Sequence, residues 1–357
     1  MERKKMKAVV LLGPNEFELQ NIPIPVSSAH EVLCKIHAVA ICGSDPKFIR
    51  GDMKGKWPPS YPFVIGHEWA GEVVAIGSEV KSLVVGNRVA GEAHSGCGIC
   101  SMCKKGKYNL CENYGNEAMG HRHYGHSSTG SYAQYGIFYE RSLTLIPDNV
   151  TYSQASIIDA AGTAMHAIDL AGITIGGSVV VIGPGPIGLI TAKLAKISGA
   201  SQIIVVGRGQ RLRLARDIVA DEIIDFEKED PIERVKQLTN GKGAHEIFEC
   251  SGAKGIVNQA VQMARKDGCV SLSGIPPVGE LDLIDSRKLV LDQIRIMGTR
   301  ANPNVSEKLL ALVSSGRLFV DDLITHHFKL DEFSTALSTF TERKDGAMKV
   351  IIEPNRA

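Results

Sequence analysis

The stretch Ser178–Gly188 reads Ser-Val-Val-Val-Ile-Gly-Pro-Gly-Pro-Ile-Gly, and it decides how the middle of the chain folds. Its run of apolar residues predicts a buried strand that ends at Gly183. The apolar periodicity of Ile187–Ile197 then predicts a helix directly after the glycines. A strand, a glycine-rich turn and a helix start are typical of a dinucleotide site, although such turns also occur as plain connections.

The three glycines of this G-x-G-x-x-G pattern have different physical tasks. Gly183 permits the tight turn, Gly185 allows backbone amides to approach a pyrophosphate, and Gly188 allows helix and strand to pack closely. Pro186 and Ile187 lie between the last two glycines. We expect all five residues to contact a dinucleotide.

Length and charge exclude several classes of protein. A chain of 357 residues predicts about two domains. Because 40 basic residues balance 39 acidic ones, nothing indicates a nucleic-acid partner, and we expect a small-molecule partner instead. The apolar run Ala8–Leu12 is too short for a signal peptide or a membrane span, so we expect a cytoplasmic protein without a membrane partner.

The pattern of expected secondary structure changes near residue 155. Before it, short runs rich in Val and Ile predict strands at Lys7–Leu12, Phe17–Gln20, Glu31–Ala40 and Gly71–Ile76. After it, strand and helix patterns alternate, which predicts an α/β fold with a doubly wound parallel sheet over residues 156–295. The tail at 296–357 is too small for its own core, so we expect it to rejoin the β-rich residues 1–155.

Four cysteines lie in one short segment, at about residues 95–112. Cys97, Cys100, Cys103 and Cys111 have the spacing C-x2-C-x2-C-x7-C. Four thiolates on one loop suit a tetrahedral structural zinc ion with no open position. Paired disulfides and an iron-sulfur cluster are the alternatives, but the Cys-Pro of the bacterial ferredoxin run is absent.

A second set of metal-type residues is dispersed. Cys42 lies in an apolar stretch, and His67 precedes Glu68. A thiolate, an imidazole and a carboxylate suit zinc in an open, catalytic site. The alternatives are a cysteine buried as a small hydrophobe and a histidine in a solvated turn.

These motifs together resemble the zinc-containing medium-chain alcohol dehydrogenases. The resemblance rests on four features in this order: Cys-Gly-Ser-Asp at 42–45, Gly-His-Glu-x-x-Gly at 66–71, the four cysteines and the glycine pattern. It is closest to the sorbitol, or polyol, branch through Ala155–Asp159, Glu249–Gly252 and Ile324–His326. It implies a GroES-like catalytic domain at 1–155, an inserted Rossmann domain at 156–295 and a return to the first domain at 296–357.

The resemblance also implies residue roles. Cys42 and His67 would hold the catalytic zinc ion, with Glu68 or Asp159 as the acidic ligand, directly or through water. Asp45 would accept the other ring N–H of His67 and fix its tautomer. Ser44 would take the proton of the substrate alcohol while hydride passes to the nicotinamide.

The sequence departs from that pattern at three places. Asp159 replaces a glutamate and is one methylene shorter. Lys47 stands where many relatives have a histidine that ends a proton relay; the alternative is an exposed lysine. His121, His123 and His126 form an unfamiliar cluster, for which we favour an exposed polar loop over a role in the substrate cleft.

The residues after the second strand indicate which dinucleotide binds. A NAD site has an acid about 20 residues past the glycines, on the ribose hydroxyls. Here Gly207 is followed by Arg208 and Arg211, and the acid is missing. Guanidinium groups match phosphate geometry, so we favour NADP(H), with the arginines on the 2′-phosphate. The alternative is an Arg208 that stacks on adenine or faces solvent in an enzyme that still accepts NAD.

The sequence therefore predicts a zinc- and NADP(H)-dependent dehydrogenase that interconverts a secondary alcohol, polyol or sugar-derived, and its ketone. A threonine- or butanediol-type dehydrogenase and a non-catalytic NADP-binding redox sensor are the alternatives. Analogy with the family favours a homo-oligomer, a tetramer before a dimer.

Overall fold

The computed structural model describes residues 4–53 and 55–356 and divides into two compact units. Unit 1 comprises Met1–Ala160 and Asn302–Ala357, and unit 2 comprises Ala161–Ala301. The divisions lie slightly beyond the boundaries predicted at 155 and 295. Asn302 donates a hydrogen bond to Asp159, and both residues belong to unit 1.

Unit 1 is built mainly from strands. Its strands are β1 (Lys5–Gly13), β2 (Glu16–Pro23), β3 (Glu31–Ala40), β4 (Glu68–Ile76), β5 (Arg88–Gly91), β6 (His94–Ser95), β7 (Arg122–His123), β8 (Tyr135–Tyr139), β9 (Leu143–Leu145), β16 (Ile324–Lys329) and β17 (Lys349–Glu353). Its α-helices are α1 (Asp45–Arg50), α2 (Ser101–Lys104), α3 (Tyr152–Ser156), α10 (Ser306–Ser314) and α11 (Phe333–Glu342). Its 3-10 turns are η1 (Tyr108–Leu110), η2 (Glu117–Met119), η3 (Glu140–Ser142), η4 (Asp321–Leu323), η5 (Leu330–Glu332) and η6 (Lys344–Gly346).

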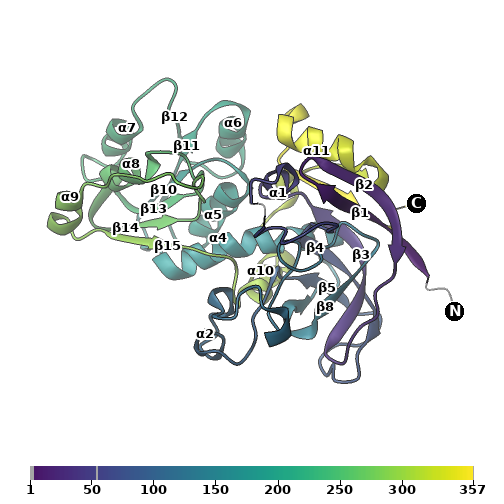
Figure 1. Ribbon diagram of the computed structural model, residues 1–357. Helices are drawn as coiled ribbons and strands as arrows, with labels where there is room; N and C mark the ends of the chain where they lie inside the picture. Colours follow the sequence, from purple (N-terminus) through teal and green to yellow (C-terminus); the bar gives the residue numbers. More distant parts are fainter. Residues whose placement is uncertain (1–3, 54, 357) are drawn as a thin grey trace. The chain divides into compact units, whose positions relative to one another are not determined.

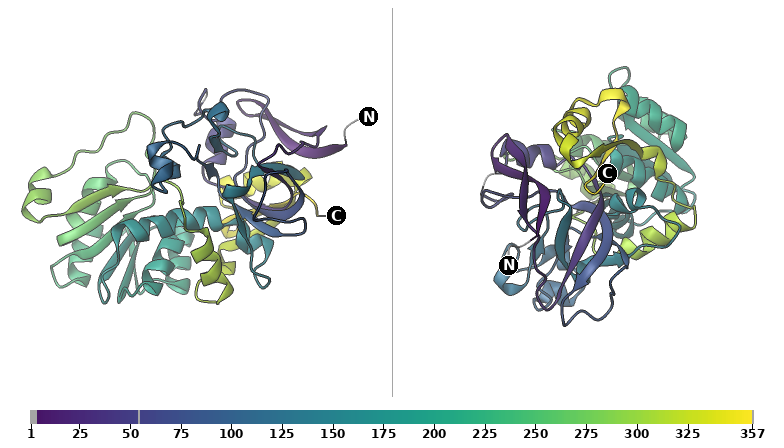
Figure 2. Two further views of the ribbon diagram at one scale, coloured as in Figure 1. Left: turned by 90° about the horizontal axis from the view of Figure 1, so that it is seen from below. Right: turned by 90° about the vertical axis from the view of Figure 1, so that its right-hand side faces the viewer.

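The main sheet of unit 1 brings the two ends of the chain together. Its strand order is β16-β17-β3-β4-β5-β9, and β8 also pairs with β3. Strand β17 pairs antiparallel with β3, so the C-terminal segment returns to the N-terminal strands, as the yellow and purple ribbons show (Figure 2). Alternate residues of β3 are buried, as expected for a strand that covers a core with one face.

Unit 2 alternates strands and helices. Its strands are β10 (Ser178–Ile182), β11 (Gln202–Gly207), β12 (Glu222–Asp225), β13 (Ala244–Glu249), β14 (Ala264–Leu272) and β15 (Arg295–Gly298). Its helices are α4 (Ile158–Ala171), whose first residues belong to unit 1, α5 (Pro186–Ile197), α6 (Gly209–Ile218), α7 (Pro231–Leu238), α8 (Ile256–Met263) and α9 (Ser286–Leu291).

The strands of unit 2 form one parallel sheet in the order β12-β11-β10-β13-β14-β15 (Figure 1). The chain first winds outward from β10 to β12 and then returns to build the other half from β13. This order confirms the predicted doubly wound sheet, and its switch point lies between β10 and β13. The G-x-G-x-x-G turn follows β10 at that point. No helix in the described part of the chain is long and apolar enough to cross a membrane.

Candidate metal centres and dinucleotide turn

Strand pairing in unit 1 brings the dispersed metal-type residues together. Ala40 at the end of β3 is the register partner of Glu68 at the start of β4. Cys42 therefore lies beside His67, and one ligand atom from each of Cys42, His67 and Glu68 lies within 4.8 Å of the others. A thiolate, an imidazole and a carboxylate at this spacing fit a zinc ion.

The electrostatics of this cluster also fit a cation. His67 is buried, and burial lowers its pKa, but Cys42, Asp45 and Asp159 outweigh burial and raise the pKa to about 10. The imidazole is thus surrounded by negative groups. A divalent ion among them would offset the same charge and leave the imidazole neutral.

Asp45 is held differently from the prediction. Its Oδ2 accepts hydrogen bonds from the backbone N–H of Cys42 at 2.8 Å and from the hydroxyl of Tyr132 at 2.7 Å. Its Oδ1 lies 3.7 Å from His67 Nδ1, which is too long for the hydrogen bond that we predicted. The carboxylate is close enough to act on the imidazole by charge, but its hydrogen bonds go to other groups.

Glu68 has a partner that the sequence analysis missed. Lys349 on β17 forms an ion pair and hydrogen bond with Glu68 Oε2, and both side chains are buried. Burial lowers the pKa of Lys349, but Glu68 and Cys42 outweigh it and raise that pKa. A lysine inside the apolar strand Lys349–Glu353 was the available signal, because lysine is seldom buried without a partner.

Asp159, the other acidic candidate, is outside the group formed by Cys42, His67 and Glu68. Its Oδ1 accepts hydrogen bonds from the backbone N–H of Ala93 at 3.0 Å and from Asn302 Nδ2 at 3.1 Å. Burial raises the pKa of Asp159, while the nearby His67 lowers it. Asp159 therefore acts on His67 through charge, and its orientation is fixed by two donors.

The two candidates for proton transfer differ in their surroundings. The Ser44 hydroxyl is buried and has no hydrogen-bond partner among the described residues. It stands two residues after Cys42, at the start of α1. Lys47 is exposed on α1, as expected for the alternative that we gave for this residue.

The histidine cluster is not an exposed loop, and our preferred interpretation of it was wrong. His121, His123 and His126 are all buried. Strands β6 and β7 pair His94 with His123, and the two rings stack with centroids 3.9 Å apart. His126 stacks on the other face of His123 at 3.6 Å and contacts the ring of His67 at 4.4 Å. Two pairing strands were needed to bring these residues together, so their spacing in the sequence did not predict the stack.

Aromatic side chains extend this stack. Trp57 meets His126 edge to face at 5.3 Å and donates a hydrogen bond from Nε1 to the hydroxyl of Tyr114 at 2.8 Å. The same hydroxyl is hydrogen-bonded to His123 Nδ1. A continuous set of rings therefore leads from β6 to the His67 imidazole.

The four-cysteine segment forms a compact lobe in unit 1. The Sγ atoms of Cys97, Cys100, Cys103 and Cys111 lie within 4.8 Å of one another, and all four are free thiols. Backbone amides donate to the sulfurs, for example Cys100 N–H to Cys97 Sγ at 3.4 Å. Burial raises the pKa of Cys97, but Asn113 and neighbouring amides outweigh burial and lower it. Hydrogen bonds from backbone amides also lower the pKa of Cys100, whereas burial raises that of Cys111 and raises that of Cys103 to about 12. The lobe thus favours the thiolate, the form that binds zinc, at two of its four cysteines.

The glycines of the turn after β10 have the backbone conformation and the close packing that we predicted for them. Gly183 has a φ of +99°, which residues with a side chain rarely adopt. A Cβ on Gly188 would lie 2.0 Å from the Gly183 carbonyl oxygen, whereas a Cβ on Gly185 would meet no described atom within 4 Å. Gly207 at the end of β11 is equally constrained, because its Cβ would lie 2.4 Å from Pro184. The turn is closely packed on one side and open at Gly185, which is the N-cap of α5.

The two arginines beyond β11 lie at the start of α6. Arg208 forms a 2.6 Å ion pair with Glu227 and lies over the ring of Phe226, and both charged side chains are exposed. Arg211 is half-buried one turn further along the helix. Asp225 at the end of β12 is paired with Lys228 at 3.0 Å. No acid stands at the end of β11 itself.

Comparisons with known proteins identify the family of the chain. Residues 28–148 match the family described as "Alcohol dehydrogenase GroES-like domain", and residues 186–315 match "Zinc-binding dehydrogenase". The chain is similar to a sorbitol dehydrogenase of Bacillus subtilis, with 31% identity over 99% of this chain and 98% of that one. It is also similar to an L-threonine 3-dehydrogenase of the same organism, with 34% identity over 99% and 100%.

The fold of the chain is similar to the solved structure of a protein from Sinorhizobium meliloti 1021. That protein is described as a zinc-binding dehydrogenase and is bound to NADP. Its TM-score is 0.90 at 29% sequence identity, and the match covers 99% of this chain and 100% of that one. The agreement extends over both units of the chain described above.

Proposed function

Because the chain belongs to the zinc-containing medium-chain alcohol dehydrogenase family, we propose that it interconverts a secondary alcohol and its ketone with NADP(H). We propose a polyol or sugar-derived alcohol as the substrate. The observation that carries the proposal is the group of Cys42, His67 and Glu68 beside the unpartnered hydroxyl of Ser44. A threonine- or butanediol-type activity is the alternative within the family.

Cys42 and His67 would hold the catalytic zinc ion, which would polarise the substrate oxygen while bound nicotinamide takes or gives the hydride. Ser44 Oγ would accept the proton of the alcohol and return it in ketone reduction. Lys349 neutralises Glu68 and holds it in place, so Glu68 supplies a carboxylate without adding an unpaired buried charge. An exposed Lys47 would pass the proton on to solvent.

The test is a substitution that removes one metal ligand from the group of Cys42, His67 and Glu68. We expect Cys42→Ser to lower kcat by about 10³-fold or more, because the ion that polarises the substrate is lost, while dinucleotide affinity stays within about twofold. Turnover is measured on polyols, amino alcohols and diols, which also separates the polyol from the threonine and butanediol alternatives. If the zinc-loaded wild type oxidises none of them, the redox-sensor alternative gains and the proposal fails.

The choice of NADP(H) rests on unit 2. An exposed ion pair such as Arg208–Glu227 contributes little stability, so a doubly charged 2′-phosphate can replace the carboxylate. We expect Arg208→Ala to weaken NADPH binding about tenfold and NADH binding less than twofold. Arg213→Ala, on an exposed residue of the same helix, is the matched control. Equal wild-type affinity for both dinucleotides would contradict the preference.

We also propose that the chain forms a homo-oligomer, a tetramer before a dimer. Between β14 and β15, the apolar side chains of Ile275, Val278, Leu281, Leu283 and Val290 are exposed. Strand β15 ends the sheet of unit 2, so a second copy would cover both the strand edge and the apolar residues. Light scattering of Leu281→Asp should give a smaller particle than the wild type, and a monomeric wild type would contradict the proposal.

A further inference from the structure

A pocket of about 350 Å³ lies in unit 2, away from the dinucleotide turn. Its wall includes Gly241 and Gly243, which precede β13, Arg265 and Lys266 in the first residues of β14, and Asp292, which precedes β15. These residues stand at the amino ends of parallel strands. The G-x-G-x-x-G turn follows the carboxyl end of β10. The pocket and the turn therefore lie at opposite ends of the parallel strands of the same sheet.

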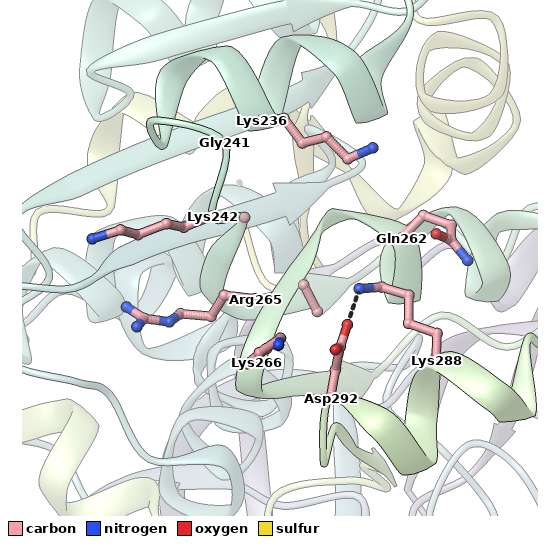
Figure 3. Close-up of a pocket in the computed structure, with 10 residues that line it drawn as sticks. Lys236, Gly241, Lys242, Gln262, Arg265, Lys266, Lys288 and Asp292 are labelled. Atoms are coloured by element: carbon pink, nitrogen blue, oxygen red, sulfur yellow. Dashed lines mark hydrogen bonds and ion pairs between the residues drawn. The ribbon is translucent and has the colours of Figure 1, made fainter.

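The charges around this pocket are strongly unbalanced. Its walls carry one carboxylate, Asp292, and five cationic side chains, from Lys236, Lys242, Arg265, Lys266 and Lys288. The whole chain has a net charge of only +1, so positive charge is concentrated here. Figure 3 shows Lys288 turned toward Asp292, and the two form a 2.6 Å ion pair. The single carboxylate is thereby already neutralised.

Three of the remaining cations have no acidic partner. In the described part of the chain, no carboxylate lies within ion-pair distance of Lys242, Arg265 or Lys266. Lys242 and Arg265 extend toward the same side in Figure 3. Arg265 Nη1 is hydrogen-bonded to His245 Nε2. Burial and then the charges of Arg265 and Lys242 lower the pKa of His245, although Glu246 acts in the opposite direction. The residues that line the pocket therefore carry more positive charge than the single lining carboxylate can offset.

We propose that this pocket binds a small anion of the phosphate class that carries at least two negative charges. A guanidinium group offers paired N–H donors that match phosphate oxygens, and lysine ammonium groups are mobile point charges on long stems. The volume suits a small molecule and is at the lower end of the range for ligand pockets. Free inorganic phosphates and phosphorylated metabolites share this chemistry. The site is separate from the proposed hydride transfer and does not depend on the catalytic zinc ion.

The test is calorimetric titration of the full, zinc-loaded chain with inorganic pyrophosphate. Saturating NADPH and NADH are present, so that the dinucleotide turn is blocked whichever cofactor the protein prefers. Separate titrations with inorganic phosphate and with a sugar bisphosphate distinguish the two sources of phosphate. We expect pyrophosphate to bind the wild type, and Lys242→Gln/Lys266→Gln to weaken that binding by at least about tenfold. Both lysines are exposed, so the variant is expected to fold, and its melting temperature checks this.

The matched control removes two lysines outside the pocket. Lys196 and Lys344 are exposed residues paired with Asp221 and Glu342, and neither lines the pocket. Lys196→Gln/Lys344→Gln changes the net charge by the same amount and should leave pyrophosphate affinity within about twofold. An equal loss in both double variants would mean that diffuse surface charge binds the anion and would overturn the proposal. Absence of binding to the wild type would overturn it as well.

Discussion

The two groups of metal-type side chains in unit 1 are built in opposite ways. The lobe takes all its thiols from the segment Cys97–Cys111, whose own backbone amides point at the sulfurs. The group around Cys42 and His67 takes its residues from the ends of β3 and β4, and its support from Tyr132 and Lys349. A local site can exist wherever the segment folds, whereas a dispersed site exists only when the whole sheet has formed. The two should therefore fail differently when they are broken.

The largest effect should follow from Cys103→Ser in the lobe. The segment has little regular structure, so metal binding supplies much of its folding free energy, and we expect a loss of more than about 5 kcal/mol in the stability of unit 1. Thermal unfolding and zinc content per chain measure this. Cys42→Ser is the control, since it should also lose one zinc ion but melt within a few degrees of the wild type. An unchanged melting temperature in Cys103→Ser would contradict the comparison.

The same contrast explains what the sequence could predict. The spacing of four cysteines and of three glycines encodes local geometry, because each set lies on one continuous turn. The alternation of strand and helix patterns was sufficient to predict the doubly wound sheet, whose strands β10 and β11 are buried apolar runs. Local spacing carries no information about pairs such as His94 with His123, which only strand pairing brings into contact.

The candidate catalytic site was predicted only in part for the same reason. The positions of Cys42 and His67 followed from motifs of a known family. Lys349 lies far along the chain from its partner Glu68, and the hydroxyl of Tyr132 reaches Asp45 from another loop. The burial that raises or lowers a pKa is also a property of the folded sheet. Such contacts depend on tertiary packing, which no single stretch of sequence specifies.

The second prediction concerns the buried ion pair that supports the dispersed site. Lys349→Met leaves Glu68 as an uncompensated buried charge, so we expect the free energy of unfolding to fall by about 3–5 kcal/mol. Urea denaturation followed by fluorescence measures the change. The double variant Glu68→Gln/Lys349→Met should recover much of the loss, because no buried charge remains.

Lys344→Met is the matched control for this prediction. Lys344 is exposed and paired with the exposed Glu342, so its replacement should change stability very little. Equal effects of the two methionine substitutions would show that the buried pair is not a support of the dispersed site.

The third prediction concerns Glu92, which is hydrogen-bonded to the lobe and precedes Ala93, the residue whose amide donates to Asp159. Its carboxylate accepts hydrogen bonds from the hydroxyl of Tyr108 in the lobe at 2.5 Å and from Ser306 on α10 at 2.6 Å. Burial, with a smaller contribution from Asp159, raises the pKa of Glu92 to about 7 despite these bonds. A raised pKa in the folded state favours the protonated form. Its contribution to stability is therefore complete below about pH 4.5 and is lost as the pH rises through about 7.

Urea denaturation of the wild type and Glu92→Gln at pH 5 and pH 8 tests this. We expect the wild type to lose on the order of 3 kcal/mol relative to the variant across this interval. Glutamine keeps the volume of the side chain and cannot ionise, so it reports the background pH dependence of the remaining groups. Parallel pH profiles for the two proteins would show that Glu92 does not couple the lobe to the Asp159 side of the site.

The smallest effect is expected for Tyr132→Phe, which removes one hydrogen bond beside the dispersed site. The ring of Tyr132 is fully buried and would keep its packing, but Asp45 would lose the donor at 2.7 Å and retain only the Cys42 amide. Loss of a hydrogen bond to a charged group predicts a drop of about 1.5 kcal/mol in stability.

Since Asp45 stands beside His67, zinc at Cys42 and His67 should dissociate faster in a chelator competition, whereas lobe zinc should not. Tyr124→Phe is the matched control, because the hydroxyl of Tyr124 accepts a hydrogen bond from the Tyr139 amide at 2.7 Å and has no contact with either metal group. A similar release of zinc from both variants would mean that Asp45 does not depend on Tyr132, and that the dispersed site is held by its strands alone.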